Sequence, residues 1–289
     1  MKTEIDTILL ATDFLQSSRL ALDYAEVLAN KLGAQLVIVN AFELGPEADL
    51  VEKLDHIPSR TRRDAEARLQ AFVAGSNCAG VPATWALVEG PVPAAVLDAV
   101  SKYEADLLVL GTQGVHRGLE HLLIGSNTEA LMLRSTCPTL TIGPHVLAGI
   151  DHNSHFKKIV YVSNFRPASA DAAPFALKLS QTLSTEIEIY QVVRDAEHAE
   201  KEPHVKEMVD SYCSRLRSFA PDVKEEWCSP EFQMARIISP EAVMEKSLDP
   251  SILMVLGTHQ LPLLERHLRT SYPYRLLTNA VCPIVTVRS

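Results

Sequence analysis

The chain has 289 residues, of which 47% are hydrophobic and 22% are charged. This composition is typical of a globular protein rather than a disordered or fibrous one, and at roughly 100 to 200 residues per domain it predicts two domains. The 27 basic and 36 acidic residues give a net charge of -9, which argues against a nucleic-acid binder that relies on a wide basic surface.

Signals for export or membrane insertion are missing from the sequence. Residues 1–6 are partly acidic, and the apolar run that follows is far shorter than a signal peptide needs. Apolar runs elsewhere are also much shorter than the roughly 20 residues that span a bilayer. We therefore expect a cytoplasmic protein without a membrane partner. The cysteines are widely spaced and predict neither disulfides nor a zinc ribbon: Cys78, Cys137, Cys213, Cys228 and Cys282.

The first half of the chain alternates short apolar runs with longer segments of helical period. This alternation predicts a parallel sheet with helices on both faces. Amphipathic stripes predict helices around residues 20–32, 65–73 and 96–103, and Gly33 stands where a helix C-cap glycine belongs. The strands are expected at residues 7–12, 35–42, 83–88, 106–111 and 138–143.

The second half repeats the first. Residues 8–14 match residues 159–165 at an offset of 151, and Cys137-Pro138 matches Cys282-Pro283. We therefore expect two five-stranded Rossmann-like domains, at residues 1–144 and 157–289, joined by a linker at 145–156. In the second domain the strands are expected at residues 158–163, 186–193, 223–228, 251–257 and 283–287, and one helix carries the stripe Val205, Val209, Tyr212, Leu216 and Phe219.

A ligand site is expected at the carboxyl edge of the first sheet, where open α/β sheets bind ligands. Asp13 follows the first strand there, and the loop after the fourth strand contains Gly111, Gly114 and Gly118. Glycines let backbone N–H groups approach an anion closely and permit positive φ. Ser126 and Glu129 have the spacing of a capping box, which predicts a helix whose N-terminus faces the same edge and attracts an anion.

These motifs resemble the universal stress protein family, and the resemblance covers nearly the whole chain as a tandem of two such domains. It rests on Asp13, the Gly111-x-x-Gly114 loop, Gly125-Ser126 and the Cys-Pro pair before the last strand. The resemblance implies the adenine nucleotide alpha hydrolase-like fold and a site for ATP or another adenine nucleotide. In that site Asp13 would contact the adenosine part, and Asn40 and Ala41 would line the adenine pocket. It also implies that the two domains pair as an intramolecular pseudo-dimer, while pairing of two chains stays open.

Two departures from the family pattern bear on this site. Ten residues separate Gly114 from Gly125, where the family has nine, so the longer loop either brings His116 and Arg117 toward the phosphates or distorts the cradle. In the second domain Asn164 replaces Asp13, and Gln260 and Thr270 stand where the loop glycines belong. We therefore expect the second domain to be degenerate. Residues 1–150 carry 11 basic and 18 acidic groups, a net charge of -7, so Mg²⁺ is expected to accompany the phosphates.

Other interpretations stay open. Asp13 could serve only as a turn or helix-capping residue, and the glycines could serve only a tight turn. The chain could be an interaction scaffold without a small ligand. A slow Mg-dependent ATPase also stays open, although the sequence has neither a Walker A motif nor a nucleophile elbow. No metal site is expected. The candidate nucleotide-binding residues are Asp13, Asn40, Ala41, Gly111, Gly114, His116, Arg117, Gly125 and Ser126.

Overall fold

The computed structural model describes residues 4–44, 60–76, 80–112, 124–146, 156–163, 172–192, 207, 214, 236–258 and 272–288. The chain packs as two units. One is built mainly of Ile5–Ile142 and is called the N-terminal unit below. The other is built mainly of His155–Ser289 and is called the C-terminal unit.

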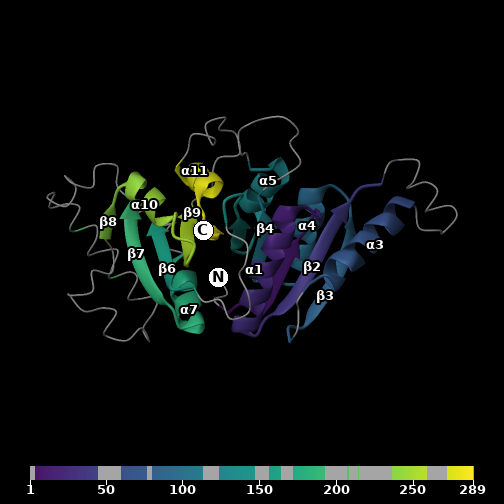
Figure 1. The fold of residues 1–289 in the computed structure, drawn as a ribbon, viewed down its shortest axis with the longest axis horizontal. Helices are drawn as coiled ribbons and strands as arrows, with labels where there is room; N and C mark the ends of the chain where they lie inside the picture. The colour runs from purple at the N-terminus through teal and green to yellow at the C-terminus, as the bar shows by residue number, and fades with distance from the viewer. Residues whose placement is uncertain are drawn as a thin grey trace. The chain divides into compact units, whose positions relative to one another are not determined.

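The N-terminal unit contains a parallel sheet with the strand order β3-β2-β1-β4-β5. Each strand lies within a residue or two of its predicted position, because buried parallel strands are nearly continuous apolar runs. Figure 1 shows these strands side by side. Their bounds are β1 (Thr7–Ala11), β2 (Gln35–Phe42), β3 (Ala83–Glu89), β4 (Leu107–Gly111) and β5 (Thr139–Ile142).

Helices cover both faces of this sheet, as predicted. Helix α1 ends at Gly33, whose φ of 66° is left-handed and whose N–H bonds to the carbonyl of Ala29. Arg19 of α1 stacks on the ring of Phe72 in α3 at 3.9 Å, so α1 and α3 form one layer, whereas α4 packs against α5. Right-handed crossovers place these pairs on opposite faces. The helices are α1 (Gln16–Leu32), α3 (Arg60–Ala74), α4 (Val92–Lys102) and α5 (Ser126–Arg134).

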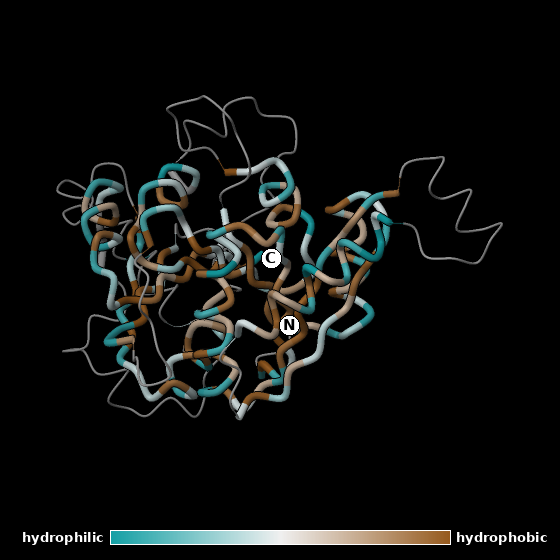
Figure 2. The backbone as a smooth tube through the Cα atoms, turned by 45° about the vertical axis from the view of Figure 1, so that its right-hand side comes forward, coloured by the Kyte–Doolittle hydropathy of each residue, from teal (hydrophilic) through white to brown (hydrophobic). Residues whose placement is uncertain are grey.

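An apolar cluster joins α4 and α5 to the sheet of the N-terminal unit. The sheet contributes alternate residues of β1, β2 and β4, which face the two helices, and α4 and α5 contribute apolar residues from their inner sides. Figure 2 shows hydrophobic (brown) and hydrophilic (teal) stretches alternating along the backbone. The buried members of this cluster, called the α4 cluster below, are Leu9, Val37, Val39, Val96, Ala99, Val100, Ala105, Leu108, Leu110 and Leu131.

The C-terminal unit has its own parallel sheet, in the order β10-β9-β6-β7-β8. The strands are β6 (Lys158–Ser163), β7 (Glu186–Val192), β8 (Arg236–Ile238), β9 (Ile252–Thr258) and β10 (Ile284–Arg288). The helices are α7 (Ala173–Leu183), α10 (Pro240–Lys246) and α11 (Tyr272–Asn279). Both units are therefore α/β with parallel, Rossmann-like sheets, and the predicted fold class is confirmed.

Some predicted elements lie in parts of the chain outside the described residues. The strand expected at residues 223–228, nearly all of the helical stripe at 205–219 and most of the linker at 145–156 lie outside the described residues. The described strand beside β7 is β8, where Ile237 pairs with Gln191. Three residues are too few to show a period, so the sequence did not predict this strand.

Two further features of the described residues concern membranes and thiols. No described helix has the length and apolar character that crossing a membrane requires. Cys282 is buried and Cys137 is half-buried, and burial raises the pKa of both thiols, that of Cys282 to about 12. Both cysteines thus occupy packed positions beside strands, as small core residues do.

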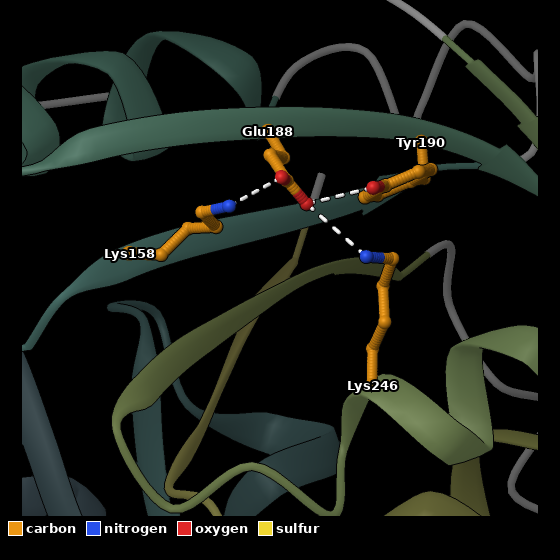
Figure 3. A network of polar contacts seen from close by, with 4 residues as sticks. All are labelled: Lys158, Glu188, Tyr190 and Lys246. Carbon is orange, nitrogen blue, oxygen red and sulfur yellow. Dashed lines mark hydrogen bonds and ion pairs between the residues drawn. The ribbon is translucent and has the colours of Figure 1, made fainter.

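A polar network connects α10 to the sheet of the C-terminal unit (Figure 3). The carboxylate of Glu188 accepts hydrogen bonds from the Tyr190 hydroxyl at 2.7 Å and from the Lys246 ammonium group at 3.3 Å. It also pairs with the Lys158 ammonium group, and the Lys246 Nζ lies 4.7 Å from the centre of the Tyr190 ring. We call these four residues the Glu188 network.

The Glu188 network predicts a loss of stability in acid. Burial raises the pKa of Glu188, but the hydrogen bonds from Lys158 and Tyr190 and the charge of Lys246 outweigh burial and lower the pKa to about 2, from an ordinary value of 4.5. A carboxyl whose pKa falls on folding stabilises the protein fully above its unfolded pKa, and this stability is lost as the pH falls from about 4.5 toward 2. Because the group is partly solvated, we expect an effect of about 1 kcal/mol.

Urea unfolding of the wild type and of Glu188→Gln across this pH window measures the effect. The difference in free energy of unfolding between the two proteins should shrink as the pH falls, because protonation removes the charge that the variant already lacks. All other carboxyl groups cancel in this comparison. A difference that stays constant down to the lower end of the window would show that Glu188 is not the responsible group.

Candidate functional site

A cavity of about 250 Å³ lies at the carboxyl edge of the N-terminal sheet. It is built from the ends of β1, β2 and β4 and from α4 and α5. The strand order reverses between β1 and β4, and this switch point is where open α/β sheets bind ligands. The lining residues are Ala11, Thr12, Asp13, Ser18, Val39, Asn40, Ala41, Val92, Val96, Leu110, Gly111, Gly125, Ser126, Asn127, Thr128 and Leu131.

Asp13 borders this cavity and also shapes the turn into α1. Its Oδ1 accepts hydrogen bonds from the Leu15 N–H at 3.0 Å and from the Ser18 hydroxyl at 2.6 Å. Asp13 therefore takes part in the turn, but the N-cap position of α1 is occupied by Leu15, so the expected capping role is wrong. Since Asp13 is exposed as well, its carboxylate can serve both the turn and a ligand.

Asn40 holds the ends of β1 and β2 together. Its Nδ2 donates to the carbonyl of Thr12 at 2.7 Å, and the Thr12 N–H donates to the carbonyl of Val39 at 2.9 Å. The side chain is buried, so the amide satisfies backbone groups at the strand ends. The neighbouring Ala41 is half-buried and adds to the wall of the cavity.

Gly111 lies against the first turn of α1. A Cβ atom built on Gly111 would be 2.7 Å from the carbonyl carbon of Ser17 and 2.9 Å from its oxygen, closer than any side chain tolerates. Gly111 does not have a positive φ, so the expectation that it supplies conformational freedom is wrong. Its role is to let α1 approach β4, and its carbonyl accepts a hydrogen bond from the Thr128 hydroxyl at 3.1 Å.

Helix α5 begins at Ser126, as predicted, but the capping box is wrong. The N-cap residue is Gly125, with extended φ and ψ of -61° and 143° and no side-chain hydrogen bond. Ser126 is already helical, and an N-cap must lie outside the helix. The Gly125 N–H donates to the carbonyl of Thr112 at 3.1 Å. This bond holds the start of α5 beside the end of β4, so the first-turn N–H groups, for which the helix itself has no carbonyl partners, lie next to the cavity.

Three candidate residues cannot be placed. Gly114, His116 and Arg117 lie outside the described residues, so the effect of the longer loop remains a prediction. The same holds for the matching positions of the second domain, Asn164 and Thr270.

The sequence analysis missed several residues that line the cavity. Ser18 follows Asp13 by about one helical turn, and Asn127 and Thr128 occupy the first turn of α5. Val92 and Val96 lie four residues apart on α4 and form an apolar wall. The start of α5 was predicted, so a search of its first turn for polar side chains would have found Asn127 and Thr128. Helix α1 begins at Gln16, four residues before the predicted stripe, which is why Ser18 was not considered.

Chemically, the lining suits a ligand with three different parts. Among the described residues that line the cavity, Asp13 is the one with a charged side chain, and a carboxylate accepts hydrogen bonds from hydroxyl or amino groups. The apolar wall suits a flat, weakly polar ring, and the start of α5 suits an anion. Within the described part of the chain, no three His, Cys, Asp or Glu side chains gather where they could hold a metal ion.

The fold and this cavity define a Rossmann-like α/β protein with a cavity at the strand switch point. Residues 4–143 match the family model described as the universal stress protein family. The "universal stress protein in QAH/OAS sulfhydrylase 3'region" of Thermus aquaticus is 32% identical over 139 residues, which cover 47% of this chain and 97% of that protein. The chain belongs to the universal stress protein family.

Solved structures extend the similarity of fold over nearly the whole chain. A universal stress protein from Archaeoglobus fulgidus has a TM-score of 0.62 at 17% identity, covering 98% of both chains. A functionally unknown protein from Pseudomonas aeruginosa has a TM-score of 0.57 at 12% identity, covering 98% of this chain and 92% of that one. These identities are low, so the two similarities concern the fold.

Proposed function

We propose that this protein acts in the stress response and binds ATP or another adenine nucleotide in the cavity of the N-terminal unit. The observation that carries the proposal is the lining of one cavity by Asp13, by an apolar wall and by the N-terminus of α5. An adenine nucleotide has the three matching parts: ribose hydroxyls, a flat ring and phosphates. Membership of the universal stress protein family supports a regulatory function for such a site.

In this proposal the nucleoside occupies the cavity and the phosphates lie at the start of α5. A volume of about 250 Å³ is close to the lower end of the roughly 300 to 1,000 Å³ of small-molecule sites, which suits a nucleoside. Asp13 would accept bonds from the ribose, and the N–H groups after Gly125 would bind phosphate. His116 and Arg117 of the longer loop would add donors, with Gly114 giving room, and Mg²⁺ would arrive with the phosphates.

The proposal also includes the organisation of the chain. Residues 1–144 would form the nucleotide-binding domain, residues 145–156 the linker and residues 157–289 a second, degenerate domain of the same family. The matching strand orders of the two units support this division. The two domains would pair as an intramolecular pseudo-dimer, and a bound nucleotide would regulate contacts with partner proteins.

Calorimetric titration with ATP and Mg²⁺ tests the nucleotide site. The wild type should bind, and at a ligand concentration 100 times Kd its free energy of unfolding should rise by about 2.7 kcal/mol. Asp13→Asn keeps an Oδ1 acceptor for Leu15 and Ser18 but removes the charge offered to the ribose. Since hydrogen bonds to charged groups contribute about 1.5 to 3 kcal/mol, we expect a loss of affinity of roughly 10- to 100-fold.

Asp98→Asn is the matched control. Asp98 is an exposed carboxylate on α4 that does not line the cavity, so its replacement should leave the affinity unchanged. If the wild type shows neither heat of binding nor thermal stabilisation with ATP, ADP, AMP or cyclic AMP, the nucleotide proposal is refuted and an interaction scaffold is favoured.

A further inference from the structure

The residue after Asp13 has an unusual backbone conformation. Phe14 has a φ of 68° and is one of three described non-glycine residues with positive φ, with Glu104 and Ser184. The left-handed conformation is unfavourable for an L-residue, and phenylalanine has no polar side chain with which to offset that cost locally. Strain of this kind persists only where the surroundings hold it, and it often lies at ligand sites.

Contacts from α3 hold Phe14 in this conformation. Its ring packs edge-on against the ring of Phe72, with the centroids 5.8 Å apart, and the guanidinium carbon of Arg68 lies 4.6 Å from the ring centre. Phe72 is itself fixed by Arg19, whose guanidinium stacks on the ring and donates to the Phe72 carbonyl at 2.8 Å. Aromatic and cation–π contacts are each favourable, and together they offset the backbone strain.

The left-handed turn determines where the Asp13 carboxylate lies. The Phe14 N–H donates to the Thr12 hydroxyl at 3.0 Å, and the next amide, that of Leu15, donates to Asp13 Oδ1 at 3.0 Å. Both peptide groups of Phe14 therefore take part in fixing the turn. Phe14 does not line the cavity, whereas Asp13 does, so the Phe14 ring packs toward α3 while Asp13 borders the site.

We propose that Phe14 is a positioning residue of the ligand site. Its ring packs against Phe72 and Arg68 of α3, and these contacts maintain the left-handed turn. The turn in turn positions the Asp13 carboxylate at the cavity, where a ligand would bind. This inference rests on the proposed nucleotide function for its effect on affinity. It also links the docking of α3 to the geometry of the site.

Two substitutions at this position separate positioning from simple packing. Phe14→Ala loses the ring contacts but keeps the penalty for positive φ, so the turn should relax to negative φ and displace Asp13. Phe14→Gly loses the same contacts, but glycine adopts positive φ without strain, so the turn should persist. For ATP with Mg²⁺ measured by calorimetry, we expect Phe14→Ala to bind roughly 5- to 30-fold more weakly than the wild type, the fold-change that corresponds to about 1 to 2 kcal/mol. Phe14→Gly should stay within about 3-fold of the wild type.

Hydrogen exchange of the Leu15 amide, measured by NMR without nucleotide, gives a second readout that does not depend on binding. Exchange should be faster in Phe14→Ala than in Phe14→Gly, because the bond to Asp13 is lost in the first variant. Glu104→Gly is the control, because it relieves positive φ at an exposed residue after α4, outside the cavity lining, and should change neither readout. If the wild type fails to bind ATP while the exchange rates differ as expected, the nucleotide proposal fails and the positioning of the turn stands. Equal exchange rates in the Ala and Gly variants would overturn the inference about Phe14, and so would equal ATP affinities of these variants where the wild type binds ATP.

Discussion

Gly111→Ala is expected to lower the free energy of unfolding of the N-terminal unit by about 2 to 3 kcal/mol, as overpacking of a tight contact does. The added Cβ would lie 2.7 Å from the carbonyl carbon of Ser17 and 2.9 Å from both its oxygen and its Cβ. Two of these atoms belong to the backbone of the first turn of α1, so the contact can be relieved only by moving the helix away from β4. In a unit of this size such a loss lowers Tm by roughly 5 to 10 °C.

Urea unfolding and calorimetry measure this change, and Gly75→Ala is the matched control. The nearest atom to a Cβ on Gly75 would be Nη1 of Arg19 at 3.5 Å, an ordinary contact with a flexible side chain. We expect the control to change stability by less than about 0.5 kcal/mol. Equal midpoints for the two variants would show that α1 does not need the close approach at Gly111.

This packing role changes how variants at Gly111 should be interpreted. A substitution there displaces α1, and the Asp13 turn is attached to α1 through Ser18. Any loss of nucleotide affinity in such a variant would therefore follow from displacement of the turn, even if Gly111 never contacts a ligand. Asp13→Asn and the pair of Phe14 variants test the site without this ambiguity.

The parts of the fold that follow simple rules could be predicted from the sequence. The five strands of the N-terminal sheet are short, mainly apolar segments, and Gly33 marks the end of α1 because glycine adopts the left-handed cap without strain. Strand β8 could not be predicted, because three residues show no period. It pairs with β7 through contacts distant in sequence, which local propensity does not record.

The candidate site, too, contains some features that the sequence predicts and others that it does not. The rule that ligands bind beyond the carboxyl ends of parallel strands identified Asp13 and the start of α5. The N-cap residue of α5 could not be predicted, because Gly125 and Ser126 are adjacent and both residue types are common at N-caps. Nothing in the sequence indicates positive φ at Phe14, since phenylalanine rarely adopts it and the contacts that hold it come from Phe72, 58 positions further along the chain.

The Glu188 network occupies the place that the α4 cluster has in the N-terminal unit. Leu9 of β1 pairs with Val37 of β2, and Val160 of β6 pairs with Glu188 of β7 in the same register. Helices α4 and α10 begin with the same Pro-x-Ala-Val pattern at residues 93–96 and 240–243. Counting three residues on from this pattern puts Lys246 of α10 at the position of Ala99 in α4. The N-terminal sheet thus contacts α4 through apolar side chains at this position, whereas the C-terminal sheet contacts α10 through the ion pair of Glu188 with Lys246.

A double-mutant cycle should show that these charges stabilise the C-terminal unit only as a group. Glu188→Val alone leaves the ammonium groups of Lys158 and Lys246 without their shared carboxylate, and we expect a loss of about 2 kcal/mol, because removing one partner of a partly buried pair leaves an uncompensated charge. Adding Lys246→Ala installs the N-terminal unit's residues at both positions and removes one of the two cations. The double variant should therefore be at least as stable as Glu188→Val, with a coupling free energy of about 1 to 2 kcal/mol.

Lys157→Ala, at an exposed lysine outside the network, is the control and should change stability by less than about 0.5 kcal/mol. Strictly additive losses in urea unfolding would mean that Glu188 and Lys246 act independently, and that α10 is held to the sheet by its apolar contacts alone.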